Sequence, residues 1–270
     1  MKTAYTGWMW VREHEGNREK FREQFEQSVL ELKYLGYDVL ENWTFLRQYF
    51  TAEEIREICA RHNIQIACLY ANLDEGMVSL KESIEFCAAI GAGWMICASP
   101  NWPAGVEHDA PMDMDEIKRE AVLLNELGAY ARERGVTLLH NPHSYTPVCR
   151  RPDIDALMSL TDPELVKLCV DAGHSVVAGV DAIALVRDYA DRVDYIHIKD
   201  LDPALAYRGR GQSWVPLGMG TVHLSAFMNT LKEVGFDGVV CAGLPTGCER
   251  INRFESARIS RQYLRQIADL

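Results

Sequence analysis

The chain has 270 residues, of which 48% are hydrophobic, and this is enough apolar surface to bury one large core. Its formal net charge is −11, and an acidic chain repels nucleic-acid phosphates and anionic membrane surfaces. No apolar run approaches the ~18 residues of a membrane-spanning helix. We therefore expect neither a nucleic-acid partner nor a membrane partner.

The distribution of cysteine, proline and glycine indicates a cytoplasmic protein with a single domain over residues 1–270. The N-terminal segment has no apolar stretch long enough for a secretory signal. None of the eight cysteines forms a CxxC pair, and several lie inside apolar segments, which is typical of reduced thiols in the cytoplasm. No Ser-, Pro- or Gly-rich linker divides the sequence.

Short apolar runs without polar alternation recur along the whole chain. This pattern is typical of parallel strands that are covered on both faces. The predicted strands are Thr3–Trp8, Asp38–Asn42, Ile64–Tyr70, Trp94–Ala98, Val136–Asn141, Val166–Asp171, Asp194–Ile198 and Gly238–Ala242.

Amphipathic segments at helical spacing separate these runs, and several end at a glycine, which favours a helix C-terminus. Asp181 precedes one of them as a predicted N-cap. The predicted helices contain Phe21–Leu32 before Gly36, Ile117–Tyr130 before Gly135, Ile183–Tyr189, Leu224–Leu231 before Gly235, and a last segment from Arg253 to the C-terminus.

This regular alternation of strands and helices predicts an α/β protein with a single (β/α)₈ TIM barrel. A doubly wound open sheet is the alternative. It is disfavoured because no GxGxxG motif follows the first strand.

In such a barrel, functional side chains lie at the carboxyl ends of the strands. Polar residues occur at or just after several predicted strand ends. Because the strand ends meet at one face of the barrel, we expect these side chains to converge. They are Glu41, Asn72, Asn141, His143, Asp171, His174, His197 and Lys199.

Asp171, His197 and Asn141 together form a set of groups that suits a divalent ion such as Mn²⁺, Mg²⁺, Co²⁺ or Zn²⁺. Such an ion would polarise a carbonyl group and stabilise an enediolate. His143 is the favoured proton carrier, because imidazole titrates near neutral pH. Glu41 or His174 would supply the second proton transfer or a contact to a substrate hydroxyl.

Two segments carry a family resemblance: VDAGHSVVAGVDAIALVRDYADRVDYIHIKD, residues 170–200, and VPLGMGTVHLSAFMNTLKEVGFDG, residues 215–238. They resemble the sugar phosphate isomerase/epimerase superfamily of xylose-isomerase-like barrels, and within it the branch of inosose (2-keto-myo-inositol) dehydratase and related sugar epimerases. The resemblance is clearest between Gly135 and Gly238. It implies a TIM barrel that acts on a sugar or cyclitol, and it also implies a homo-oligomer.

That family holds one divalent ion with Glu, Asp, His and Glu from strands five to eight. By motif, the Asp is Asp171 and the His is His197. The two glutamates fall on Asn141 and Gly243, so the chain departs from the family at two of the four ligands. A weakly held metal, a displaced metal and no metal remain open, with Cys241 disfavoured as a replacement ligand because it lies a layer deeper.

Lys199, Asn72 and Arg208 are candidate substrate-binding residues. The alternative for Lys199 is an ion pair with Asp200 at the barrel rim, and the alternative for Arg208 is a solvated loop. Several tryptophans could stack on the C–H face of a sugar or pack in the core. They are Trp8, Trp10, Trp43 and Trp102.

The sequence therefore favours an isomerase, epimerase or lyase that removes a proton next to a carbonyl of a keto-sugar, keto-inositol or keto-glycoside. The absence of both family glutamates favours elimination slightly, because elimination needs only one strong base. The alternative is a sugar-binding or partner subunit that has lost catalysis. Endonuclease activity at abasic DNA is disfavoured by the acidic charge.

Overall fold

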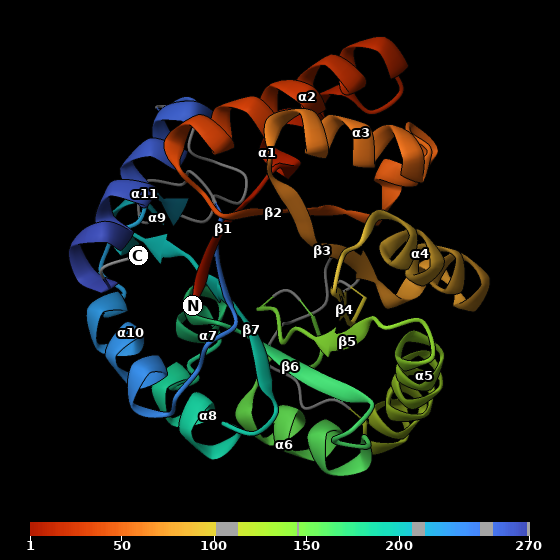
Figure 1. The fold of residues 1–270 in the computed structure, drawn as a ribbon. Helices are drawn as coiled ribbons and strands as arrows, with labels where there is room; N and C mark the ends of the chain where they lie inside the picture. The colour runs from red at the N-terminus through yellow and green to blue at the C-terminus, as the bar shows by residue number, and fades with distance from the viewer. Residues whose placement is uncertain (101–112, 145, 207–213, 244–250, 269–270) are drawn as a thin grey trace.

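The computed structural model describes residues 1–100, 113–144, 146–206, 214–243 and 251–268, and it forms a closed barrel of parallel strands. Figure 1 shows the strands surrounded by helices. The strand order around the barrel is β1-β10-β7-β6-β5-β4-β3-β2, so the first and last strands of the barrel pair and close it. The strands are β1 (Lys2–Thr6), β2 (Val39–Trp43), β3 (Gln65–Asn72), β4 (Trp94–Ala98), β5 (Thr137–His140), β6 (Val166–Asp171), β7 (Val193–Ile198) and β10 (Val239–Ala242).

The fold class and every predicted barrel strand are confirmed, with boundaries that differ by at most two residues. One addition was not predicted. Between β7 and β10, β8 (Asp200–Leu201) pairs antiparallel with β9 (Trp214–Val215) outside the barrel. This ribbon is too short to leave an apolar pattern in the sequence.

The helices form the outer layer of the barrel (Figure 1). Gly36 ends the second of them in a left-handed conformation, with φ of 83°, and the Asp181 side chain accepts hydrogen bonds from the first turn of α8, as predicted. The helices are α1 (Trp8–Val11), α2 (Arg18–Leu35), α3 (Ala52–His62), α4 (Met77–Ile90), α5 (Met114–Arg132), α6 (Arg151–Leu160), α7 (Ala172–Val177), α8 (Ala182–Asp188), α9 (Pro203–Ala206), α10 (Leu224–Glu233) and α11 (Arg253–Ala268), with short 3₁₀ turns η1 (Arg12–His14), η2 (Thr44–Gln48) and η3 (Leu73–Glu75).

Two apolar cores cover the two faces of the strands. The larger core lies between the strands and the helices. The smaller core fills the barrel interior, and small side chains such as Ala4, Cys68, Ala98, Cys169 and Cys241 contribute much of it. Because the interior is packed, functional groups are restricted to the layer at the strand ends.

The cysteines at positions 59, 68, 87, 97, 149, 169 and 241 are buried and carry free thiols. Burial raises the pKa of the Cys59 thiol to about 11, so this thiol is protonated at neutral pH. Within the described ranges, none of the helices combines the length and apolar character that are needed to cross a bilayer.

His140 lies outside the barrel, on the side opposite to the strand-end groups, as the alternation along β5 predicts. Its Nδ1 lies 3.7 Å from Glu120 Oε1, and Ser99 donates a 2.7 Å hydrogen bond to the same oxygen. Burial raises the pKa of Glu120 to about 7, and burial lowers the pKa of His140 to about 3. Near neutral pH, this buried cluster therefore favours uncharged side chains.

The buried carboxyl group of Glu120 should make the free energy of unfolding depend on pH, and replacing Glu120 should remove this dependence. Its pKa is higher in the folded state than in the unfolded chain, so the folded protein binds more protons and loses stability as the pH rises from about 4.5 to about 7. Glu120→Gln is expected to increase the free energy of unfolding at pH 8.5 by about 2 kcal/mol more than at pH 5.5. Urea unfolding at both pH values measures the difference, and an equal effect at the two pH values would contradict it.

Candidate functional site

The candidate site lies at the carboxyl ends of the strands, where β2, β6, β7 and β10 direct polar side chains inward. In register, Cys241 on β10 pairs with His197 on β7, and Asp171 on β6 pairs with the same residue. Glu41 reaches this group from β2, which lies opposite β6 in the order of eight strands. Four strands that are far apart in sequence therefore contribute to one cluster.

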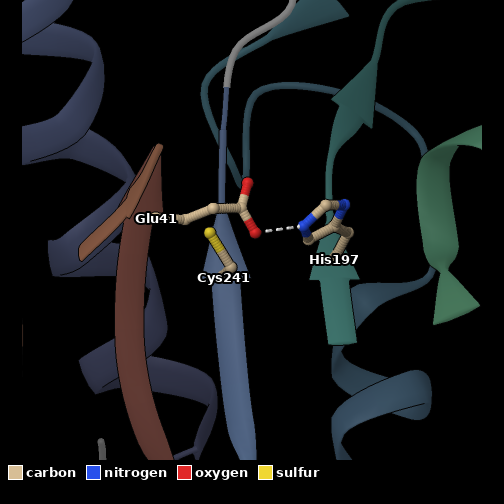
Figure 2. Close-up of side chains that lie close together, drawn as sticks. All are labelled: Glu41, His197 and Cys241. Atoms are coloured by element: carbon tan, nitrogen blue, oxygen red, sulfur yellow. Dashed lines mark hydrogen bonds and ion pairs between the residues drawn. The ribbon is translucent and has the colours of Figure 1, made fainter. Parts of the chain in front are cut away.

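Glu41 and His197 form the centre of this cluster. Their side chains are 5% and 6% exposed, and His197 Nε2 lies 2.6 Å from Glu41 Oε2. Figure 2 shows the second oxygen of the Glu41 carboxylate directed away from the imidazole, with Cys241 beneath the carboxylate. A buried carboxylate needs a partner of this kind, because an unpaired charge in a low-dielectric interior is costly.

Asp171 ends β6 and uses its two carboxylate oxygens for different purposes. Oδ1 accepts hydrogen bonds from the backbone N–H groups of Gly173 and His174, at 2.9 and 3.0 Å, and so caps α7. Oδ2 forms an ion pair with Lys199 Nζ and lies 3.7 Å from His197 Nδ1. Burial alone would raise the pKa of Asp171, but the Lys199 ammonium and His197 lower it below its usual value. Asp171 is therefore ionised at neutral pH.

Lys199 pairs with Asp171, and the alternative of an ion pair with Asp200 is wrong. The Asp200 carboxylate instead accepts backbone hydrogen bonds, including those from Gly218 and Gly220 at 2.9 Å. These hydrogen bonds stabilise the negative charge of Asp200 and fix the segment that follows β7.

His143 and His174 form a second group beside Asp171. Their ring centroids are 3.5 Å apart, and Ser144 Oγ lies 2.8 Å from His174 Nδ1. Burial, followed by the neighbouring His174 and the Lys199 charge, lowers the pKa of His143 well below its usual value. Burial and Lys199 do the same for His174. Both imidazoles are therefore neutral at pH 7.

Asn141 follows β5 and is fully buried. Its Nδ2 donates a 3.0 Å hydrogen bond to the carbonyl oxygen of Cys169, and its Oδ1 accepts one from the Tyr70 hydroxyl at 3.4 Å. These contacts tie β5 to β6 and β3. The Tyr70 ring also lies stacked beside the His197 ring, with centroids 6.3 Å apart.

Aromatic rings extend the site from Tyr70 along the β1–β3 side. The Trp43 ring lies 4.7 Å from Tyr70, and Trp8 lies 5.2 Å from Trp43 between ring centroids. Trp10 belongs to the core instead, because it is fully buried and its Nε1 donates to Glu31. Trp102 lies outside the described residues.

The other two predicted substrate-binding residues, Asn72 and Arg208, are not part of the described cluster. Asn72 ends β3 in a partly exposed position, and its backbone N–H donates to Glu75 Oε1 at 3.1 Å. Arg208 lies outside the described residues. Tyr70 was not predicted as a site residue, and Cys241 was disfavoured as a ligand. Their inward positions two residues from Asn72 and Gly243 were the available signal.

The groups at the predicted metal position do not fit the four-ligand set that the family resemblance implies. Asn141 is engaged by Tyr70 and Cys169, Asp171 by the cap of α7 and Lys199, and His197 by Glu41. Asn141 also offers no negative charge, so the ligand set is poor for a dication.

A different trio, Glu41, His197 and Cys241, brings ligand-type atoms within 4.8 Å of one another (Figure 2). Burial, followed by the Glu41 charge, raises the pKa of the Cys241 thiol well above its usual value. The Cys241 thiol donates a 3.6 Å hydrogen bond to the Ala242 carbonyl oxygen, and Glu41 is already paired with His197.

Gly243 lies at the position where the family resemblance implies the last glutamate ligand. A Cβ atom at this position would lie 2.8 Å from Thr6 Cγ2, because Thr6 at the end of β1 fills the space. A neighbouring side chain therefore packs against the backbone at this position.

Residues 29–267 match the family described as xylose isomerase-like TIM barrel, and the chain belongs to this family. An inosose dehydratase from Lacticaseibacillus casei is 33% identical over 162 residues, which cover 56% of this chain and 54% of that protein. The chain thus spans about half the length of this relative. An inosose dehydratase from Clostridium perfringens is 28% identical over 208 residues, with 70% of each chain covered.

Solved structures show the same fold at low sequence identity. The crystal structure of the IolI protein with a bound zinc atom has a TM-score of 0.73 and 20% identity, covering 100% of this chain and 98% of that chain. The 3-keto-D-glucoside 4-epimerase from E. coli has a TM-score of 0.74 and 17% identity, with both chains fully covered. The fold and the family are therefore established independently of the site.

The contact between Gly243 and Thr6 predicts a double-mutant effect. Gly243→Ala should lower the free energy of unfolding by about 1–2 kcal/mol, because the new methyl group meets Thr6 Cγ2 and a β-branched side chain moves little. Combining it with Thr6→Ser, which removes Cγ2, should restore most of the loss. Gly93→Ala is the control, since its Cβ would meet nothing within 4 Å. Additive effects of the two substitutions would contradict the contact.

Proposed function

We propose that this protein is an enzyme that removes a proton from the carbon next to a carbonyl in a keto-sugar, keto-inositol or keto-glycoside. The result would be epimerisation, isomerisation or elimination. Inosose dehydratases among the relatives and a 3-keto-D-glucoside 4-epimerase among the fold neighbours support this substrate class, because their names specify keto derivatives of a cyclitol or a sugar.

One observation carries the proposal. Glu41, His197, Asp171 and Lys199 form a continuous chain of basic and acidic groups at the carboxyl ends of the strands. Buried charges of this kind cost stability, and they are common where a protein must transfer protons or stabilise developing charge. These four side chains connect β2 to β6 and β7, so the series crosses the barrel.

Proton-transfer groups lie at two places in the cluster. Glu41 offers a carboxylate oxygen that is directed away from His197 (Figure 2). His143 and His174 offer neutral imidazoles on the β5–β6 side, since their pKa values are lowered by burial. We assign Glu41 to proton abstraction and His143, with His174, to the second proton transfer. A substrate between them would meet a base on one side and an acid–base group on the other.

The walls of the site suit a polyhydroxylated ring. Trp43 and Tyr70 offer aromatic faces that pack against C–H groups, and Asn72 with Lys199 would offer polar contacts to hydroxyl groups. From the sequence alone, Arg208 is also proposed to contact the substrate. Within the proposed class, elimination of water or an aglycone is the favoured outcome, because it needs only one strong base.

Deuterium incorporation from D₂O tests proton abstraction directly. The protein is incubated with a ketohexose, 2-keto-myo-inositol and a 3-keto-glucoside, and mass spectrometry detects either deuterium uptake or loss of water or aglycone. Glu41→Gln should reduce the rate by about 100-fold or more, because it removes the base and keeps the shape. Glu120→Gln is the control, as a buried glutamate outside the barrel. No reaction with any substrate would contradict the proposal.

His143→Ala should reduce turnover by a similar factor and leave the fold intact, since proton transfers contribute about 100-fold or more to rate. His223→Ala is the control, because His223 is exposed at the start of α10. Rates are compared under the same conditions as above, with circular dichroism as the check on folding. Unchanged turnover would remove His143 from the mechanism. Sugar binding without any reaction in the wild-type protein would favour the sugar-binding subunit.

A further inference from the structure

The Lys199 ammonium lies where charge is most concentrated in the site. It contacts Asp171 Oδ2, the same oxygen that lies 3.7 Å from His197 Nδ1 and 4.0 Å from His174 Nε2. The Lys199 side chain is 13% exposed, so this is a largely buried ion pair at the edge of the cluster rather than a surface contact. Such a pair is weakly screened by solvent.

The backbone fixes both members of this pair. Asp171 is held because its other oxygen caps α7. Gly173 lets the start of α7 pack closely against Lys199, since a Cβ at Gly173 would lie 2.7 Å from Lys199 Cβ and 2.7 Å from a ring carbon of Trp214. The ammonium is therefore positioned before any substrate binds, and a preorganised charge stabilises a developing anion more effectively than a mobile one.

The site already holds a cation, the Lys199 ammonium, beside Asp171. Asp171 and Glu41 contribute two carboxylates, Lys199 contributes one ammonium, and His197 lies between the two carboxylates. The other two family ligand positions, Asn141 and Gly243, contribute no charge. A dication at Asp171 would have to displace Lys199 from Oδ2, with fewer anionic ligands than the family provides.

We propose that the Lys199 ammonium replaces the metal ion of the family as the group that polarises the substrate carbonyl, so that turnover is independent of divalent metal. This rests on the proposed function. The base takes the proton from the α-carbon, the C–H electron pair forms the C=C bond of the enediolate, and the carbonyl π electrons move to oxygen. Lys199 donates a hydrogen bond to that oxygen, which bears the new negative charge.

A metal-binding measurement tests the replacement without any substrate. Lys199→Met removes the ammonium and frees Asp171 Oδ2. Millimolar MnCl₂ or CoCl₂ should therefore raise the melting temperature of Lys199→Met and leave that of the wild-type protein unchanged. Wild-type protein purified without chelator should contain substoichiometric metal. A stoichiometric metal in the wild-type protein, or equal stabilisation of both proteins, would overturn the proposal.

A kinetic measurement tests the role of the ammonium. Wild-type protein treated with EDTA should keep its rate within about twofold, and Lys199→Met should lose about 100-fold or more. Lys81→Met is the matched control, because it breaks a lysine–carboxylate pair on the helical surface, with Glu126. Lys199→Ala should regain activity when ethylammonium is added, which a purely structural lysine would not show.

The two proposals fail differently. Reaction that is lost with EDTA and restored by metal overturns the role of Lys199 but leaves proton abstraction in place. Absence of reaction with every keto substrate, with and without metal, overturns the proposed function, and the metal-binding comparison then decides whether Lys199 occupies the place of the ion.

Discussion

The buried carboxylate of Asp171 is the interaction on which the candidate site depends. One oxygen caps α7, and the other pairs with Lys199 and faces His197. A charge in this position is tolerated because hydrogen bonds and an ammonium compensate for the loss of hydration. The same hydrogen bonds and ion pair fix the start of α7 and the end of β7. Asp171 therefore determines both the local structure and the geometry of the site.

The site stays polar although two of the ligand positions that the family resemblance implies carry no charge. The Asn141 side chain forms hydrogen bonds with Tyr70 and with the carbonyl oxygen of Cys169, and Gly243 packs against Thr6. What remains is a connected set of polar and charged groups, from Glu41 through His197 and Asp171 to Lys199. Proton transfer and stabilisation of an oxyanion are the chemistry that such a set supports.

The strands and the strand-end residues could be predicted because parallel barrel strands are short apolar runs and because their carboxyl ends converge. Asp171, His197 and Glu41 follow from that rule. The pairing of Lys199 with Asp171 rather than with the adjacent Asp200 does not, because it depends on which way the chain turns after β7. The place of Cys241 beneath Glu41 likewise depends on the reach of a side chain across the barrel (Figure 2).

The sequence by itself determined the order of the strands and helices, the family and the chemical types of the groups at the strand ends. Hydrophobic periodicity and residue identity are local properties, and they can be read along the chain. Only the tertiary structure decided which groups are partners, because distance and burial arise when strands distant in sequence close into a barrel. That closure joins Glu41 to His197 across 156 positions and sets the pKa of Asp171 through its neighbours.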